Sequence, residues 1–118
     1  MAESWSRFLI LDAGFPTPEL QAAHWDSRGL IGFSDFWWPV YGLVGEVDGI
    51  QKYVDPNMGA GLSTSQRIRR EKARDNRLSA QVRRVVHWQW EDLARAGALV
   101  SILRAAGLPT DRRLRPWP

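Results

Sequence analysis

Proline and glycine divide this 118-residue chain into short segments, which limits the folds open to it. The run Phe15–Pro18 fits neither a helix nor a strand ladder, because proline fixes φ and lacks an amide hydrogen. Further breaks are predicted at Asp26–Gly29, at Trp38–Tyr41 and over a long loop, Gly49–Leu62. No apolar run approaches the about 18 residues that a membrane helix needs, and the first residues lack a signal-peptide layout. We therefore expect a cytoplasmic chain with no membrane partner.

The segments between these breaks differ in their hydrophobic period. Helices are predicted over Glu3–Ala13, from a cap at Ser63 to Gln81, and over Leu93–Ala106, and strands over Glu19–Trp25, Leu30–Trp37, Gly42–Asp48 and Val82–Trp90. The order α-β-β-β-α-β-α predicts an α/β (α+β) fold with a mixed sheet flanked by helices. We expect residues 1–108 to form a single domain and residues 109–118 to form a basic, proline-containing tail.

Cysteine and histidine usage narrows the chemistry. The chain has no Cys, which excludes disulfide frameworks, thiolate metal sites and Cys nucleophiles. Its two His residues, His24 and His87, lie in predicted strands, and the sequence favours a structural role for both. Among the seven Trp residues, we expect Trp38, which precedes a proline, to be exposed. The core is predicted to take in the other tryptophans of the helices and strands: Trp5, Trp25, Trp37, Trp88 and Trp90.

Three carboxylates are the main candidates for a chemical site. Asp35 lies in the second strand, and Glu46 and Asp48 are two residues apart in the third, so both leave that strand on the same face. Hard cations such as Mg²⁺ or Mn²⁺ bind carboxylate oxygens, and a buried carboxylate is costly unless it is paired or binds a metal. The alternative is that all three lie on a solvated face. The residues alone leave both interpretations open.

A bound cation at these carboxylates would activate water and neutralise charge on a phosphodiester. Lys52 follows shortly after, and its ammonium group could orient the attacking water or stabilise the transition state. The catalytic candidates are therefore Asp35, Glu46, Asp48 and Lys52, of which the three acids are the expected metal ligands.

The second half of the chain is strongly basic. Residues 64–118 hold thirteen bases against five acids, whereas residues 1–63 hold three bases against eight acids. The candidate DNA-binding side chains of the predicted helix are Arg67, Arg69, Arg70, Lys72, Arg74 and Arg77. Clustered arginines suit contacts to the phosphate backbone. A solvated helix face, paired in part with Glu71 and Asp75, is the alternative.

The chain resembles a known family in four motifs that occur in order. These are LDAGFPTPELQ at Leu11–Gln21, SDFWWP followed by GEVDGIQKY within Ser34–Tyr53, REKARDNRL at Arg70–Leu78, and VVHWQWEDL at Val85–Leu93. They resemble the restriction-endonuclease-like family related to very-short-patch-repair endonucleases. The similarity is closest to the C-terminal domains of actinobacterial abortive-infection AbiEi-type antitoxin proteins, and it covers about residues 3–103.

This resemblance implies a restriction-endonuclease-like core. Asp35 and Glu46 match the two acids of the PD-(D/E)xK pattern, and Glu3 falls where the first helix of such folds often offers a further acid. The chain departs from the pattern at Asp48, which stands where the lysine is expected, so Lys52 would have to replace that lysine. Histidines that very-short-patch-repair enzymes place near these positions are missing.

Two functions follow as hypotheses. The first is a divalent-metal-dependent DNA endonuclease-like domain that hydrolyses phosphodiesters with Mg²⁺ or Mn²⁺. The second is a catalytically weak or inactive nuclease-fold module that binds DNA or a protein partner, as in an abortive-infection antitoxin or regulator. Similar chains often carry an N-terminal winged-helix domain, which this sequence does not include.

Overall fold

The computed structural model describes residues 1–48 and 63–111. Its elements are α1 (Ala2–Asp12), β1 (Glu19–Asp26), β2 (Gly29–Trp38), a 3-10 turn η1 (Pro39–Tyr41), β3 (Leu43–Asp48), α2 (Thr64–Gln81), β4 (Arg84–Gln89), α3 (Trp90–Ala94) and α4 (Ala98–Ala105). The predicted loop Gly49–Leu62 and the tail residues 112–118 lie outside the described residues. No helix in the described part of the chain is long and apolar enough to cross a membrane.

The four strands form one sheet in the order β1-β2-β3-β4. β1 and β2 form an antiparallel hairpin from Glu19↔Trp37 to Asp26↔Gly29. β3 is antiparallel to β2 and parallel to β4. The predicted mixed sheet of an α/β fold is therefore confirmed, with four helices in the described residues.

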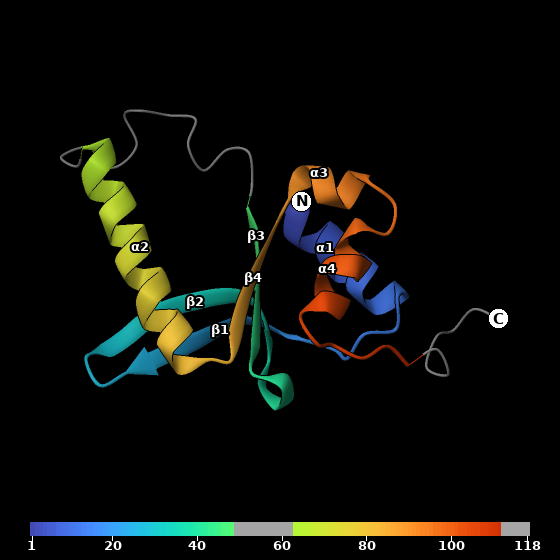
Figure 1. Ribbon diagram of the computed structural model, residues 1–118, viewed down its shortest axis with the longest axis horizontal. Helices are drawn as coiled ribbons and strands as arrows, with labels where there is room; N and C mark the ends of the chain where they lie inside the picture. The colour runs from blue at the N-terminus through green and yellow to red at the C-terminus, as the bar shows by residue number, and fades with distance from the viewer. Residues whose placement is uncertain (49–62, 112–118) are drawn as a thin grey trace.

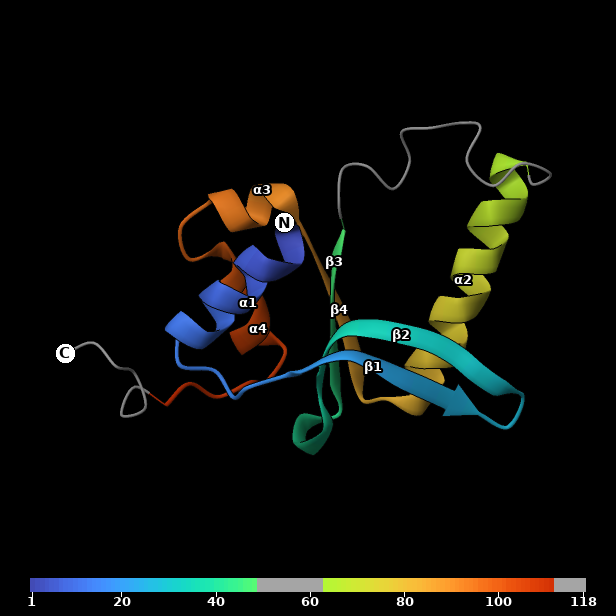
Figure 2. The same ribbon diagram turned by 180° about the vertical axis from the view of Figure 1, so that it is seen from behind.

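The helices lie on both sides of this sheet (Figures 1 and 2). α1, α3 and α4 cluster on one side, whereas α2 stands alone on the other. The long β1–β2 hairpin extends away from the three-helix side. α2 starts at the predicted cap, where the Ser63 hydroxyl accepts from the Gln66 amide and the Gln66 side chain accepts from the Ser63 amide. This reciprocal pair satisfies two helix-end donors.

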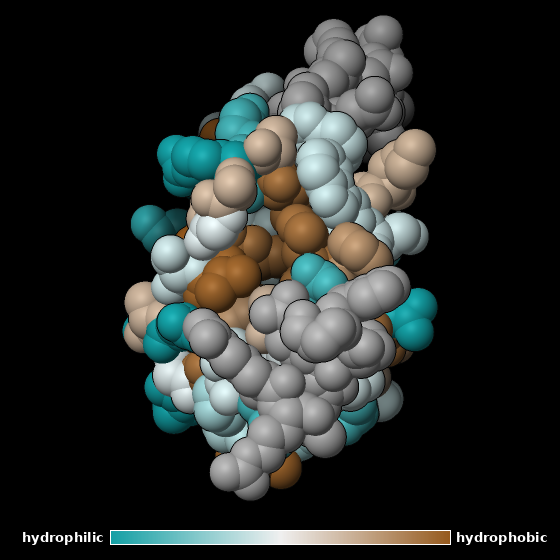
Figure 3. All heavy atoms as spheres, turned by 90° about the vertical axis from the view of Figure 1, so that its right-hand side faces the viewer, coloured by the Kyte–Doolittle hydropathy of each residue, from teal (hydrophilic) through white to brown (hydrophobic). Residues whose placement is uncertain are grey.

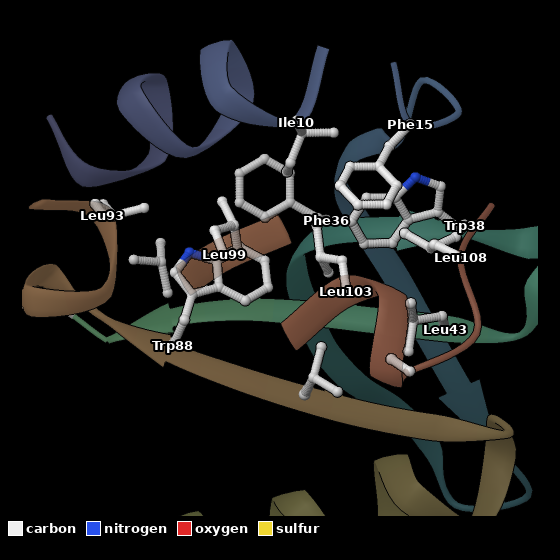
Figure 4. Packing of buried hydrophobic residues seen from close by; sticks show 13 residues of the cluster. Ile10, Phe15, Phe36, Trp38, Leu43, Trp88, Leu93, Leu99, Leu103 and Leu108 are labelled. Carbon is white, nitrogen blue, oxygen red and sulfur yellow. The ribbon is translucent and has the colours of Figure 1, made fainter. Parts of the chain in front are cut away.

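The core lies between the sheet and the three-helix side (Figure 4). Phe36, Trp38 and Trp88 stack there, with ring centroids 6.3 Å apart for Phe36–Trp38 and 5.6 Å for Phe36–Trp88. The Trp88 indole donates to the Ser6 hydroxyl, so its one polar atom is satisfied. Gly45 leaves room for these rings, because an added Cβ would stand 2.6 Å from Trp88.

The structure corrects two predictions about tryptophan. Trp38 is buried rather than exposed, because its indole donates to the Pro16 carbonyl at 2.8 Å and its ring joins the core. Trp25 is exposed rather than buried, since it lies in the hairpin away from the three-helix side. Trp88 is fully buried, as predicted, and Trp5, Trp37 and Trp90 are partly buried.

Two helix predictions are also corrected. The expected helix Leu93–Ala106 is two helices, because the chain turns through a left-handed Gly97 between α3 and α4. Trp90 begins α3 instead of ending β4, since the Asp92 side chain accepts from the Gln89 amide at 2.8 Å at the start of the helix. In α1 the side chain of Phe8 faces solvent, and the buried side chains are Ser6 and Ile10. Hydrophobic surface gathers on the three-helix side of the molecule (Figure 3).

Candidate functional site

A cavity of about 530 Å³ lies between the sheet and α2. Its lining residues are Phe33, Asp35, Glu46, Asp48, Glu71, Arg74, Asp75 and His87. We call it the acidic cavity, because five of these eight residues are carboxylic acids. Asp35, Glu46 and Asp48 are among them, so the fold brings the three predicted carboxylates to one cavity.

Strand alternation explains which side chains of β3 and β4 reach this cavity. Val47 and Trp88 pair across the two parallel strands and belong to the core. Glu46 and His87, the preceding pair in the register, therefore point to the opposite face, where α2 lies. His87 Nδ1 stands 3.7 Å from Asp48 Oδ2.

His87 lines the acidic cavity, although the sequence favoured a structural role for this residue. The alternation of buried Val86 and Trp88 with exposed His87 in β4 could have placed the imidazole on the face opposite the core. The parallel pairing with β3, which only the structure provides, puts it beside Glu46 and Asp48.

Glu46 is the most buried acid of the cavity, with 7% of its surface exposed. Burial raises the pKa of Glu46, while the Arg74 guanidinium lowers it and the Asp35 charge raises it further. Arg74 Nη1 donates to Glu46 Oε1 at 3.1 Å, and Arg74 Nη2 donates to the Phe33 carbonyl at 2.8 Å. Arg74 therefore neutralises Glu46 and ties α2 to both β2 and β3.

Asp35 lies where the β2–β3 ladder ends, next to the pair Phe36↔Gly45. Its Oδ2 accepts from the Val47 amide at 3.0 Å, and its Oδ1 accepts from Gln21 Nε2 at 3.3 Å. Glu3 of α1 reaches the same point, where Gln21 Nε2 donates to Glu3 Oε1 at 2.6 Å. A hydrogen bond with Asp35 raises the pKa of the Glu3 carboxyl to about 7, with burial and the Asp35 charge adding to the shift.

The donor types of the cavity suit Mg²⁺ or Mn²⁺, but the expected three-carboxylate centre is not assembled. Within residues 1–48 and 63–111, no three His, Asp or Glu side chains are grouped so that they could hold a metal ion. In this structure Asp35 accepts a hydrogen bond from the Val47 amide, and Glu46 is paired with Arg74. Asp48 in turn accepts from Gln89 Nε2 at 3.3 Å. Mg²⁺ often uses only one or two carboxylates together with water and substrate phosphate, so the donor set still fits a cation of that kind.

The predicted DNA-binding residues separate into two groups. Arg69, Arg70 and Lys72 are exposed on α2, and Arg67 is half-buried. Arg74 and Arg77 are half-buried and paired with acids of the sheet. Arg77 binds Asp26 through two hydrogen bonds of 2.7 Å, and this contact lowers the pKa of Asp26 to about 2.

Arg77 therefore fixes α2 against the β1–β2 hairpin. Its guanidinium group is occupied by this contact with Asp26. The exposed residues of α2 remain as candidates for phosphate contacts. Lys52, the fourth catalytic candidate, lies outside the described residues.

Comparisons with protein-family models, with curated proteins and with solved structures each found no match to this chain. The restriction-endonuclease-like resemblance therefore stays a prediction from the sequence motifs. The structure shows an α/β domain with a mixed sheet and a cavity between this sheet and α2. Carboxylates of β2 and β3 and the His87 imidazole of β4 line this cavity.

Proposed function

We propose that this chain is a nuclease-like domain that binds a divalent cation in the acidic cavity and hydrolyses DNA phosphodiesters there. The observation that carries the proposal is that Asp35, Glu46 and Asp48 all line one cavity. Asp35 and Glu46 also match the two acids of the PD-(D/E)xK pattern in the motif resemblance. The cation is Mg²⁺ or Mn²⁺, which matches the carboxylate donors.

Asp35 and Glu46 would hold the cation, with Asp48 and His87 at the same wall of the cavity. When bound, the cation supplies an activated water and neutralises charge on the phosphodiester. The Arg74 guanidinium has to leave Glu46 Oε1 for this carboxylate to become a ligand. Once released, Arg74 is placed to donate to a phosphate oxygen.

The exposed bases of α2 would hold the DNA backbone. Arg69, Arg70 and Lys72 lie on the same helix that contributes Glu71 and Arg74 to the cavity. A backbone bound along α2 would therefore pass close to the cavity. Contacts of this kind position DNA without reading its sequence.

The test is cleavage of labelled single-stranded and double-stranded DNA with Mg²⁺, with Mn²⁺ and with chelator. We expect cleavage that needs the cation, that is lost in Glu46→Gln and that is kept in Glu19→Gln. Glu19 is a matched control, because it is exposed at the start of β1 and lines neither this cavity nor its neighbours. Absence of cleavage with both cations, or equal cleavage by Glu46→Gln, would contradict the proposal.

The Arg74–Glu46 ion pair favours a second candidate, a non-catalytic module that binds DNA or a protein partner on a nuclease-like fold. In that case Arg74 is a permanent replacement for the cation and the acidic cavity is structural. DNA binding would then be equal in chelator and in Mg²⁺, would be unchanged by Asp35→Ala, and would be lost with Arg69→Ala and Arg70→Ala together. Calorimetric titration with Mg²⁺ or Mn²⁺ separates the two candidates, because only the first predicts binding that Asp35→Ala removes.

A further inference from the structure

Gln21 has an unusual backbone conformation. Its φ of 49° is the only positive φ of a non-glycine residue in the described part of the chain. The left-handed region is disfavoured for residues with a Cβ, and strained backbone persists only where the surroundings hold it. Gln21 stands opposite Asp35, between the register pairs Leu20↔Phe36 and Ala22↔Ser34. The irregularity in β1 therefore coincides with the candidate cation ligand in β2.

The Gln21 side chain joins two carboxyl groups. Its Nε2 donates to Glu3 Oε1 at 2.6 Å and to Asp35 Oδ1 at 3.3 Å. The other oxygen of Asp35 accepts from the Val47 amide. The Asp35 carboxylate is therefore held from β1 at one oxygen and from β3 at the other.

Asp35 also lies between two cavities. Besides the acidic cavity, it lines a smaller one of about 160 Å³ with residues of α1, β1 and β2, among them Glu3 and Gln21. A side chain that borders both spaces needs a contact that selects its orientation. The amide group suits this task, because it carries two donors and can serve two carboxyl oxygens at once.

We propose that Gln21 is a positioning residue, whose carboxamide fixes the Asp35 carboxylate for cation binding and links it to Glu3 of α1. This inference rests on the proposed function, since it takes Asp35 as a cation ligand. Carboxylates that bind metals are commonly oriented by hydrogen bonds of this kind, and their loss weakens metal affinity by about 10-fold to 100-fold. To place its carboxamide beside Asp35, Gln21 adopts the strained left-handed backbone conformation.

The experiment compares Gln21→Gly and Gln21→Met with a control, Ala23→Gly. Glycine adopts the left-handed backbone without the penalty that a Cβ brings, and methionine carries the same Cβ as glutamine, but both variants lack the carboxamide. Ala23→Gly loosens the same strand at an exposed position without touching Asp35. Two quantities are measured: hydrogen exchange of the Val47 amide in chelator, and the affinity for Mn²⁺.

For both Gln21 variants we expect Val47 exchange about 10-fold faster than in wild type and Mn²⁺ binding weaker by about 10-fold or more. The control should change neither quantity. Wild-type values of both quantities in Gln21→Gly would overturn the inference, and would show that Gln21 serves only the backbone irregularity. Faster Val47 exchange in a protein whose wild type binds no Mn²⁺ would overturn the proposed function and uphold the positioning of Asp35.

Discussion

Replacing Arg74 with methionine tests how α2 is held over the acidic cavity. The change removes the cation from Glu46 but keeps an unbranched side chain of similar length. Breaking a fully buried ion pair costs about 3–5 kcal/mol, and breaking an exposed one costs about 0–1 kcal/mol. The Glu46 side chain is 9% exposed and that of Arg74 is 30% exposed, so the pair is intermediate. We expect Arg74→Met to lower the free energy of unfolding at pH 7 by about 2 kcal/mol.

The pH dependence of this loss identifies its cause. Burial raises the pKa of Glu46, and Arg74 opposes the shift, so Arg74→Met raises this pKa further. A carboxyl group whose pKa is raised by folding adds stability that is present below its ordinary pKa of 4.5 and is lost as pH rises through the raised value. The difference in the free energy of unfolding between Arg74→Met and wild type should therefore be small below pH 4.5 and should grow as pH rises above it.

The assay is urea unfolding and thermal melting across this pH range, with Arg70→Met as the control. Arg70 is exposed on the same helix and lines no part of the cavity. We expect the control to change stability by about 0.5 kcal/mol or less. Saturating Mn²⁺ should raise the free energy of unfolding of Arg74→Met more than that of wild type. In the variant Mn²⁺ no longer competes with the Arg74 guanidinium for Glu46. Equal stability of the two variants at pH 7 would refute the reasoning.

Three further predictions use other contacts of the structure. Gly45→Ala should destabilise the fold by about 1–3 kcal/mol in urea unfolding, because the new Cβ would stand 2.6 Å from the buried Trp88 ring, and an unchanged midpoint would contradict this packing. Glu3→Gln should remove a loss of thermal stability that wild type shows as pH rises through about 7, and identical pH profiles would count against the carboxyl contact of Glu3. Replacing both Arg69 and Arg70 with Ala should weaken binding to unrelated DNA sequences alike and reduce the salt dependence, whereas a loss confined to one sequence would indicate base contacts instead.

Local patterns predicted the mixed sheet and the shared strand face of Glu46 and Asp48. The spacing of Glu46 and Asp48 places both on one face of a strand, and neighbouring strands then bring Asp35 to the same cavity. The helix cap at Ser63 could also be predicted from the sequence, because capping depends on residues three positions apart. These features need only contacts along one strand, one helix end or one hairpin.

Features that depend on distant segments could not be predicted. Arg74 and Arg77 looked like free cations, but they pair with Glu46 and Asp26, which lie 28 and 51 residues earlier. Trp38 looked exposed because its burial depends on Pro16, 22 residues away. Local residue patterns show which side chains share a strand face, but not which segment of the chain will cover that face.

The cation site is tested most directly by locating Mn²⁺ in solution. Paramagnetic Mn²⁺ broadens the amide signals of nearby residues, so a titration of ¹⁵N-labelled protein maps the bound ion. We predict that Glu46, Val47 and His87 broaden first, and that Glu46→Gln needs a higher Mn²⁺ concentration for the same effect. Broadening that begins elsewhere in the chain, or none at millimolar Mn²⁺, would contradict the account.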